Sequence, residues 1–255
     1  MSRLNGKIAL VTGGSRSLGR EVVERLAQDG ADIILTYRKE KEQAEEVKKL
    51  VEGLGRKAEI LQVDLNGTAE LDRLVGDVDG LLKKVWGRDK LDFLINNAGM
   101  IEPQMIEDIS EEAYDRQMNT NLKSVLFLTQ KMLPRLNDGG RILVVGSGLT
   151  RFTFPVMMAY SMGKAALETF ARYLAKHVGE RKITVNAVAP GALYTDFNRA
   201  GFDAAPDHVA GIAAGTALGR VGEAEDVGGV VAFLCSEDGR WITGQRLEVS
   251  GGMLI

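Results

Sequence analysis

The chain has 255 residues, 45% of them apolar, which is enough to form one large domain or two small ones. Its net charge of −3 argues against a surface for nucleic acid or an anionic membrane. Cys235 is the single cysteine, so an internal disulfide is excluded and a cysteine-built metal site is not expected. The first residues reach a glycine before they form an apolar signal segment, and no later stretch is expected to span a membrane. We therefore expect a cytoplasmic protein.

Short β-branched runs alternate with helical stretches along almost the whole chain. The seven expected strands cover residues 7–12, 31–37, 57–64, 91–97, 141–147, 183–189 and 245–249. The first six are nearly continuous in apolar residues, as is typical of strands covered on both faces. Residues 18–30 and 39–55 have the apolar spacing of helices, and Gly30 is a suitable end for the first of them.

Alternating strands and helices are compatible with an open doubly wound sheet or with a closed eightfold barrel. Seven strands, with the most glycine-rich turn after the first, favour a Rossmann-type α/β fold: an open parallel sheet flanked by helices. No repeat, low-complexity linker or change of composition divides the chain, so we expect a single domain over residues 1–255. In such a sheet, a ligand binds at the carboxyl ends of the strands.

The first strand-to-helix turn, VTGGSRSLGRE, covers residues 11–21. Its glycines are Gly13, Gly14 and Gly19, and Ser17 occupies a place where a further glycine is expected, so strict G-x-G-x-x-G fails. The free N–H groups and the dipole of the following helix still favour an anion. By itself, so loose a pattern is equally compatible with an ordinary glycine turn.

Further motifs follow this turn in order: Asn96-Asn97-Ala98-Gly99, Tyr160-x-x-x-Lys164 and Pro190-Gly191. Together with the T-G-x-x-x-x-x-G spacing of the turn, they resemble the short-chain dehydrogenase/reductase superfamily over essentially the whole chain. The family loop reads T-G-x-x-x-G-x-G, and Ser17 replaces its middle glycine. A serine there could crowd a pyrophosphate or donate to it. We expect an intact site, since a serine at a helix start carries no conformational penalty.

Cofactor choice depends on the end of the second strand. An acid there binds the ribose of NAD, whereas an arginine suits the 2′-phosphate of NADP. Arg38 follows the strand with no acid at its end, and the resemblance implies that Arg16 and Arg38 hold this phosphate of NADPH. The alternative is that both are surface arginines. The resemblance places the remaining cofactor contacts at Gly13, Ser15, Ser17, Leu18, Asp64, Leu65, Asn97, Ala98, Gly99, Tyr160, Lys164, Pro190, Leu193 and Thr195.

Tyr160 and Lys164 are four residues apart in an expected helix, on one face, and Ser147 ends the preceding strand. The resemblance implies that Tyr160 protonates a carbonyl oxygen as hydride arrives and that Ser147 binds the same oxygen. It implies that Lys164 tunes Tyr160 and holds the nicotinamide ribose, and that Asn121 anchors a water relay. We expect the ammonium and the helix N-terminus to lower the pKa of Tyr160 from its usual value near 10. Each residue also has an ordinary structural interpretation: Ser147 as a cap at the end of a strand, Asn121 as a polar helix residue, and Tyr160 as an aromatic residue at the start of a helix.

The sequence therefore predicts an NADPH-dependent reductase that converts a ketone or aldehyde to an alcohol reversibly. The first alternative is a 3-oxoacyl-[acyl-carrier-protein] reductase, although an acid in residues 136–140 beside the catalytic strand weakens the case for an acidic carrier. Its docking residues would be Arg172, Lys176, Arg181 and Lys182. The second alternative is a dinucleotide-sensing scaffold without turnover, which has no need of Ser147, Tyr160 and Lys164 together.

Substrate choice is expected to depend on Leu149, Phe152, Met157 and Phe197. Residues 196–215 are rich in glycine and alanine with little periodicity, and we expect them to form a substrate lid. Its apolar members favour a substrate other than a sugar. His177, late in a helix, and His208, in a loop, are expected to be solvated, and no metal is expected.

Assembly is the last expectation. The family resemblance, including the apolar C-terminal residues 241–255, implies a homotetramer in which the last strand and tail are buried against a neighbour. Apolar stripes in residues 125–136 and 166–178 are candidates for a second interface. The alternative is that these stripes face only their own sheet.

Overall fold

Seven strands pair in parallel in one sheet of order β3-β2-β1-β4-β5-β6-β7, which confirms the doubly wound α/β fold. The computed structural model describes residues 3–255. The strands are β1 (Ile8–Val11), β2 (Asp32–Tyr37), β3 (Ala58–Gln62), β4 (Leu91–Asn96), β5 (Leu136–Val145), β6 (Thr184–Pro190) and β7 (Arg246–Val249). All seven expected strands are present, with one substantial difference at the start of β5.

β5 begins at Leu136 instead of residue 141. Residues 137–140 have the composition of a turn, but Leu136 pairs with Leu91 and the register shifts between Leu91 and Phe93. Gly139 has a φ of +75°, and a Cβ on Gly140 would lie 2.8 Å from the Asp92 carbonyl oxygen. The glycines therefore make an irregularity within the strand rather than a turn before it.

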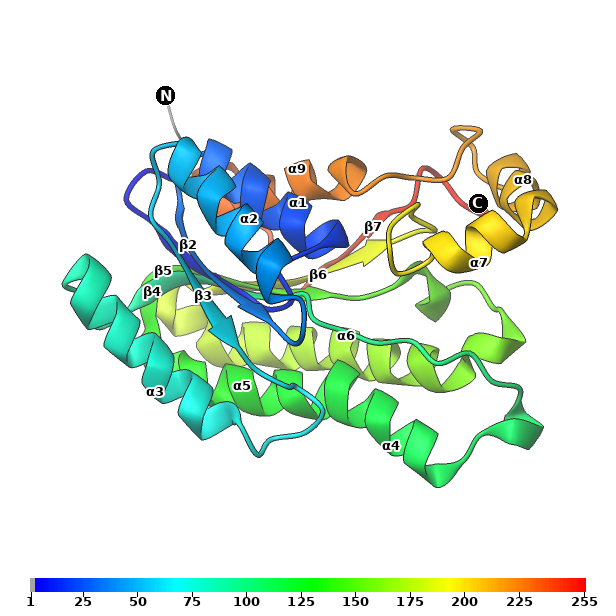
Figure 1. Ribbon diagram of the computed structural model, residues 1–255, viewed down its shortest axis with the longest axis horizontal. Helices are drawn as coiled ribbons and strands as arrows, with labels where there is room; N and C mark the ends of the chain where they lie inside the picture. The colour runs from blue at the N-terminus through cyan, green and yellow to red at the C-terminus, as the bar shows by residue number, and fades with distance from the viewer. Residues whose placement is uncertain (1–2) are drawn as a thin grey trace.

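Helices cover both faces of the sheet (Figure 1). One face packs against α1 (Ser17–Gln28), α2 (Lys41–Gly53) and α9 (Glu225–Cys235). The other packs against α3 (Leu71–Leu81), α5 (Ser124–Met132) and α6 (Met158–Val178). Ile8 and Leu10 of β1 belong to one apolar cluster and Ala9 and Val11 to the other, as the period of two requires.

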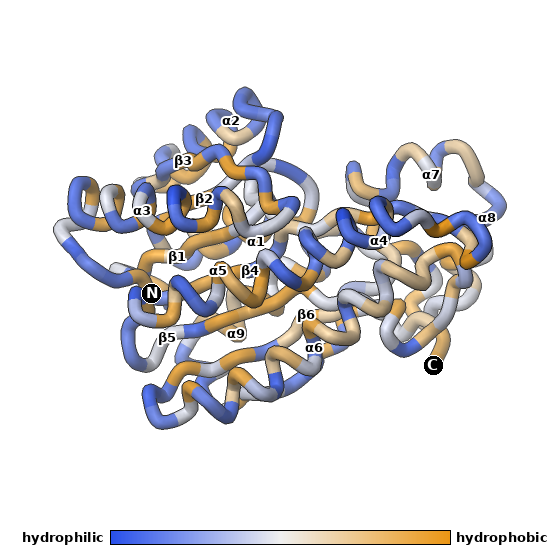
Figure 2. Tube along the Cα trace, turned by 90° about the horizontal axis from the view of Figure 1, so that it is seen from below, coloured by the Kyte–Doolittle hydropathy of each residue, from blue (hydrophilic) through white to orange (hydrophobic). Residues whose placement is uncertain are grey.

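The central strands β1, β4 and β6 are buried throughout, whereas the edge strands β3 and β7 are mostly half-buried. The expectation that the first six strands are covered on both faces is therefore wrong for β3, because it lies at the edge. The tube in Figure 2 shows apolar strands between helices whose outer faces are polar. No helix in residues 3–255 is both long and apolar enough to cross a membrane.

Residues 196–215 contain two short helices rather than an irregular loop: α7 (Arg199–Ala204) and α8 (Pro206–Ala214). α4 (Glu111–Met118) continues through a π-helical turn, Asn119–Lys123, into α5. In Figure 1, α7, α8 and the C-terminus lie together at one end of the molecule. Residues from α7, α8 and the C-terminal tail line one cavity with residues that follow the strands, so this end of the molecule carries the candidate site.

Candidate active site

The loop after β4 braces the glycine-rich loop after β1. Thr12 Oγ1 accepts hydrogen bonds from the backbone N–H groups of Asn97 and Ala98, both at 3.0 Å. In return, Asn97 Nδ2 donates to the carbonyl oxygens of Thr12 and Gly13 at 2.9 and 3.1 Å. Asn97, expected as a ribose contact, thus has a second task, which is to fix the shape of the loop.

Ser17 adopts a φ of +50°, in the left-handed region that glycine enters freely and serine seldom does. The expectation that a serine carries no conformational penalty here is therefore wrong. Its Oγ donates a 3.3 Å hydrogen bond to Asp196 at the start of the expected lid. Gly19 is under a different constraint, since a Cβ there would lie 2.0 Å from the Gly13 carbonyl oxygen.

A cavity of about 700 Å³ runs from the glycine-rich loop to the expected lid. Arg16 and Arg38 line its first end with exposed side chains, and Glu40, which the sequence analysis did not consider, lines it too. Every residue expected to contact the cofactor borders this cavity: Gly13, Ser15, Arg16, Ser17, Leu18, Arg38, Asp64, Leu65, Asn97, Ala98, Gly99, Tyr160, Lys164, Pro190, Leu193 and Thr195.

The chemistry of the first end fits a phosphorylated dinucleotide. The N-terminus of α1 opens at the glycine-rich loop, and no acidic side chain occupies its first turn. The helix dipole and the free backbone N–H groups favour an anion there. Arg16 and Arg38 add two guanidinium groups, which suit the geometry of a phosphate.

Ser147 and Lys164 meet Tyr160 just beyond the carboxyl end of β5. Lys164 Nζ donates to the Val145 carbonyl oxygen at 2.7 Å and lies 5.6 Å from the centre of the Tyr160 ring. Ser147 caps a short helical turn and accepts from the Leu149 N–H at 3.2 Å. Ser147 and Lys164 are buried, while α6 presents Tyr160 and Lys164 on one face.

Burial is the main cause of the pKa shifts of Tyr160 and Lys164. It raises the pKa of Tyr160 to about 12, against a smaller lowering by the hydrogen bond with Ser147. It lowers the pKa of Lys164 to about 8, against a smaller raising by the carboxylate of Glu168. The expectation that the ammonium lowers the pKa of Tyr160 is therefore wrong for the protein alone, because desolvation is the larger effect. Tyr160 is protonated at neutral pH and able to donate.

Asn121 lies behind the catalytic group and outside the cavity lining. It is fully buried in the π-helical turn, where its amide accepts from the Met100 N–H at 3.0 Å and donates to the Met100 carbonyl oxygen at 2.9 Å. A Cβ on Gly99 would lie 3.0 Å from Asn121 Oδ1 and 3.4 Å from Lys164 Nζ. Asn121 thus fixes the segment after β4 beside Lys164, and its expected water relay stays a prediction.

The far end of the cavity is apolar and aromatic. The four expected substrate residues, Leu149, Phe152, Met157 and Phe197, line it. Phe154 packs edge-on against Phe152 with ring centres 6.2 Å apart, and against His208 at 6.3 Å. His208 lies in α8 and not in a loop, and it belongs to the cavity wall. The sequence analysis missed Phe154, Val156, Phe202, His208, Ile212 and Met253 in this wall.

One residue expected to dock an acidic carrier has another role. Arg181 donates to Asp138 at 2.8 Å and to the Leu133 carbonyl oxygen at 2.8 Å, near the amino end of β5 and away from the cavity. Within residues 3–255, no three His, Cys, Asp or Glu side chains form a group that could hold a metal ion.

A Rossmann-type sheet whose cavity joins an anion-binding loop to a buried serine and lysine and a half-buried tyrosine defines a nicotinamide-dependent oxidoreductase. The family model described as enoyl-(acyl carrier protein) reductase matches residues 13–254. An uncharacterized oxidoreductase of Methylorubrum extorquens is 38% identical over 99% of this chain and all of its own length. The chain belongs to the short-chain dehydrogenase/reductase family.

Relatives with named reactions match the chain over nearly its whole length as well. The trihydroxynaphthalene reductase of Colletotrichum orbiculare is 35% identical over 97% of this chain and 89% of its own. The landomycin C-6 ketoreductase LanV, solved with NADP and rabelomycin, has a TM-score of 0.91 and 38% identity, and the match covers 99% and 98% of the two chains. LugOII, described as a promiscuous reductase for keto-reduction at C1 in lugdunomycin biosynthesis, has a TM-score of 0.94 and 40% identity over the whole of both chains. The protein is an oxidoreductase acting on carbonyl groups or the corresponding alcohols.

Proposed function

We propose that this protein reduces a ketone carried by an aromatic or polycyclic ring system, with NADPH as the reductant. Reduction of a carbonyl by NADPH is the reaction class of its family relatives, and the ring-shaped substrate is the new element. The observation that carries it is the aromatic wall of Phe152, Phe154 and His208 in the same cavity as Ser147 and Tyr160. Flat, apolar rings pack well against the edges and faces of such side chains.

The catalytic residues divide the work by charge and position. NADPH supplies the hydride when it is bound. Arg16 and Arg38 hold its 2′-phosphate, and Ser147 donates a hydrogen bond to the substrate oxygen as negative charge develops there. Tyr160, protonated at neutral pH, delivers its proton to that oxygen. The buried ammonium of Lys164 then stabilises the phenolate that remains.

Two named relatives support the ring-shaped substrate. One is a trihydroxynaphthalene reductase, and the other is a landomycin C-6 ketoreductase solved with NADP and rabelomycin. Residues 196–215 add Phe202 and Ile212 to the cavity, and both belong to the same apolar cluster as Phe152 and Phe154. An apolar, ring-sized space next to a proton donor suits a fused-ring ketone better than a polar sugar.

The test compares ketones of matched reactivity. NADPH oxidation is measured with a bicyclic aromatic ketone, a monocyclic aliphatic ketone and a carrier-free 3-oxoacyl thioester. We expect the highest kcat/KM for the bicyclic ketone, and a loss of about tenfold for it alone in Phe154→Ala, in line with the worth of an aromatic pair. Tyr114→Ala, an exposed aromatic outside the cavity lining, is the matched control. Equal efficiency with all three ketones would overturn the ring-shaped substrate.

Assembly into a homotetramer is part of the proposal. Phe127 on α5 and Tyr173 on α6 are 36% and 77% exposed, and Trp241 and Ile255 near the C-terminus are 95% and 93% exposed. Exposed aromatic and apolar side chains on α5 and α6 and near the C-terminus support the two interfaces proposed there. Sedimentation velocity at micromolar concentration is expected to give a tetramer, and a monomer would refute it.

A further inference from the structure

The last strand carries a polar face that the catalytic roles do not use. Leu247 and Val249 of β7 pack against the apolar cluster beneath α1 and α9. Arg246 and Glu248 alternate with them and therefore point to the other face of the sheet, the side of α6. Their side chains are only 25% and 19% exposed, although β7 is an edge strand. Charges held this far from water need specific partners.

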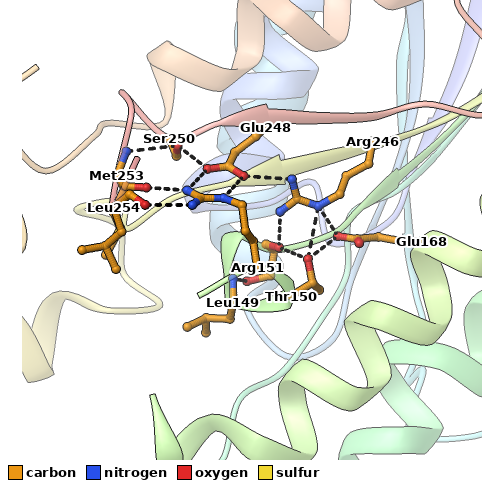
Figure 3. A network of polar contacts seen from close by, with 10 residues as sticks. Leu149, Thr150, Arg151, Glu168, Arg246, Glu248, Ser250, Met253 and Leu254 are labelled. Atoms are coloured by element: carbon orange, nitrogen blue, oxygen red, sulfur yellow. Dashed lines mark hydrogen bonds and ion pairs between the residues drawn. The ribbon is translucent and has the colours of Figure 1, made fainter. Parts of the chain in front are cut away.

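Arg246 finds its partners in the two segments that carry the catalytic residues. Its Nη2 donates to the backbone carbonyl oxygen of Ser147 at 3.1 Å. Its Nε lies 3.0 Å from Glu168 Oε1 and 3.2 Å from Thr150 Oγ1, and its Nη1 donates to Glu248 at 2.9 Å (Figure 3). One guanidinium therefore joins the loop after β5 to helix α6.

Glu168 connects this network to Lys164. It follows Lys164 by one helical turn, its side chain is 11% exposed, and its carboxylate favours the ammonium of Lys164 against the effect of burial. Thr150 Oγ1 lies 3.0 Å from the same carboxylate and 2.9 Å from the Ser147 carbonyl oxygen. Ser147 and Lys164 are thus tied to one cluster of partly buried charges.

We propose that Arg246 is a positioning residue for catalysis, which holds Ser147 in register with Tyr160 and Lys164 by binding the Ser147 carbonyl oxygen and the Glu168 carboxylate together. Ser147 sits on the loop after β5, whereas Tyr160 and Lys164 sit on α6, so their groups converge on one substrate oxygen only if the two segments keep a fixed spacing. A misplacement of about 1 Å in such a group lowers the rate by about 10².

The proposal also has an electrostatic consequence. The groups that face Lys164 are Tyr160 and Glu168 on α6, the Val145 carbonyl oxygen of β5, and Asn121 from the π-helical turn. Of these, Glu168 carries the negative charge, and Arg246 offsets that charge through their ion pair. Without Arg246, the negative charge of Glu168 acts more strongly on Lys164 and raises the pKa of its ammonium. Without Glu168, this raising effect is lost and the pKa falls. The two changes therefore move the titration of Lys164 in opposite directions.

The experiment measures kcat, the KM for NADPH and the pH dependence of the reduction in Arg246→Gln, Arg246→Lys and Glu168→Gln. It rests on carbonyl reduction but not on a ring-shaped substrate, so any ketone reduced by the wild type serves. We expect Arg246→Gln to lower kcat by about ten- to a hundredfold with little change in the KM for NADPH, and Arg246→Lys to recover part of the loss. The alkaline limb of the pH profile of kcat should move to higher pH in Arg246→Gln and to lower pH in Glu168→Gln.

Arg135→Gln is the matched control, because Arg135 forms a comparably part-buried ion pair with Asp79, away from the cavity lining. It should change the melting temperature without changing kcat. A folded Arg246→Gln with wild-type kcat and an unmoved pH profile would overturn the proposal. If Arg246→Gln does not fold, the same two measurements are made on Glu168→Gln. A wild-type kcat and an unmoved pH profile in that variant would then overturn the proposal. Crystal structures of wild type and variant give a readout independent of any substrate, with an expected shift of Ser147 relative to Lys164 of at least about 0.5 Å.

Discussion

The two ends of the cavity are built in different ways. At the cofactor end, the loops after β1 and β4 brace each other through backbone groups, Thr12 and Asn97, and they follow fully buried strands. At the substrate end, the wall comes from residues 149–157, from α7 and α8, and from Met253 near the C-terminus. The first end depends on the backbone geometry of two loops that the side chains of Thr12 and Asn97 hold together, whereas the second depends on side chains from several segments of the chain. Two of these segments, α7 and α8, lie beside the C-terminus in Figure 1.

This difference separates the reaction from the choice of substrate. Backbone geometry tolerates few residue types, as the 2.0 Å approach of a Cβ on Gly19 to the Gly13 carbonyl oxygen shows. Side chains such as Phe154 and His208 form a wall whose shape changes with each substitution while the sheet beneath remains. Substitutions at the substrate end should therefore alter which ketone is reduced. Substitutions at the cofactor end should decide whether any ketone is reduced.

The largest effect should come from Tyr160→Phe, which removes one hydroxyl and keeps the ring. General acid catalysis contributes about 10²–10⁴-fold, so the rate of reduction should fall by at least about 10² for every ketone alike. Folding and NADPH affinity should survive. Stopped-flow measurement of NADPH oxidation, with chemistry shown to limit the rate, checks this.

Phe152→Ala is the corresponding variant at the substrate end, and it should change kcat/KM by different factors for different ketones.

A Tyr160→Phe variant that keeps more than about a tenth of the wild-type turnover would remove Tyr160 from proton transfer. It would also break the division between the two ends of the cavity.

Cofactor preference should respond next. Arg38→Asp replaces a cation at the adenosine end with an anion and should reverse or level the preference for NADPH over NADH, a change of about ten- to a hundredfold in kcat/KM. The ranking of ketone substrates should stay the same. Steady-state kinetics with both cofactors provides the test, and equal efficiency in the wild type would contradict the assignment of Arg16 and Arg38.

The pH dependence should be a property of the buried catalytic group alone. Since burial lowers the pKa of Lys164 to about 8, its ammonium is lost as the pH rises through about 8, and kcat/KM for reduction should fall above this value. Oxidation of the alcohol needs a phenolate at Tyr160, whose pKa is raised to about 12, so it should increase with pH where Lys164 still carries its charge. Parallel profiles in both directions would contradict these roles.

The sequence was sufficient for the strands of the sheet, since strand periodicity is a local signal, and its motifs were sufficient to name the residues that line the first end of the cavity. Their roles toward a cofactor stay predictions. It was insufficient where tertiary packing decides. The network of Arg246 and Glu168 brings together residues far apart in the chain, and its readable signals were the alternation R-x-E on β7 and the four-residue spacing of Tyr160, Lys164 and Glu168. The direction of the pKa shift of Tyr160 was wrong because burial, which the motif does not reveal, raises this pKa by more than the hydrogen bond with Ser147 lowers it.

The smallest change in stability and affinity is expected for a substitution of Ser17. This residue joins the glycine-rich loop to residues 196–215 through its hydrogen bond to Asp196. Its φ of +50° is unfavourable for serine by about 1 kcal/mol, so Ser17→Gly should relieve strain. Part of that gain is offset by the greater freedom of glycine in the unfolded chain, about 0.5–1 kcal/mol, and by loss of the hydrogen bond to Asp196.

We therefore expect a change in the free energy of unfolding of no more than about 1 kcal/mol, and NADPH affinity within about tenfold of the wild type. Asp196→Ala is the control, because it removes the hydrogen bond and leaves the backbone at residue 17 unchanged. Chemical denaturation and fluorescence titration with NADPH measure both quantities. If Ser17→Gly and Asp196→Ala both weaken substrate binding while NADPH affinity holds, the serine acts on the substrate side rather than on the phosphate, because its partner Asp196 starts the segment proposed as a lid. A loss of NADPH affinity well beyond tenfold in Ser17→Gly alone would instead make its hydroxyl a principal phosphate ligand.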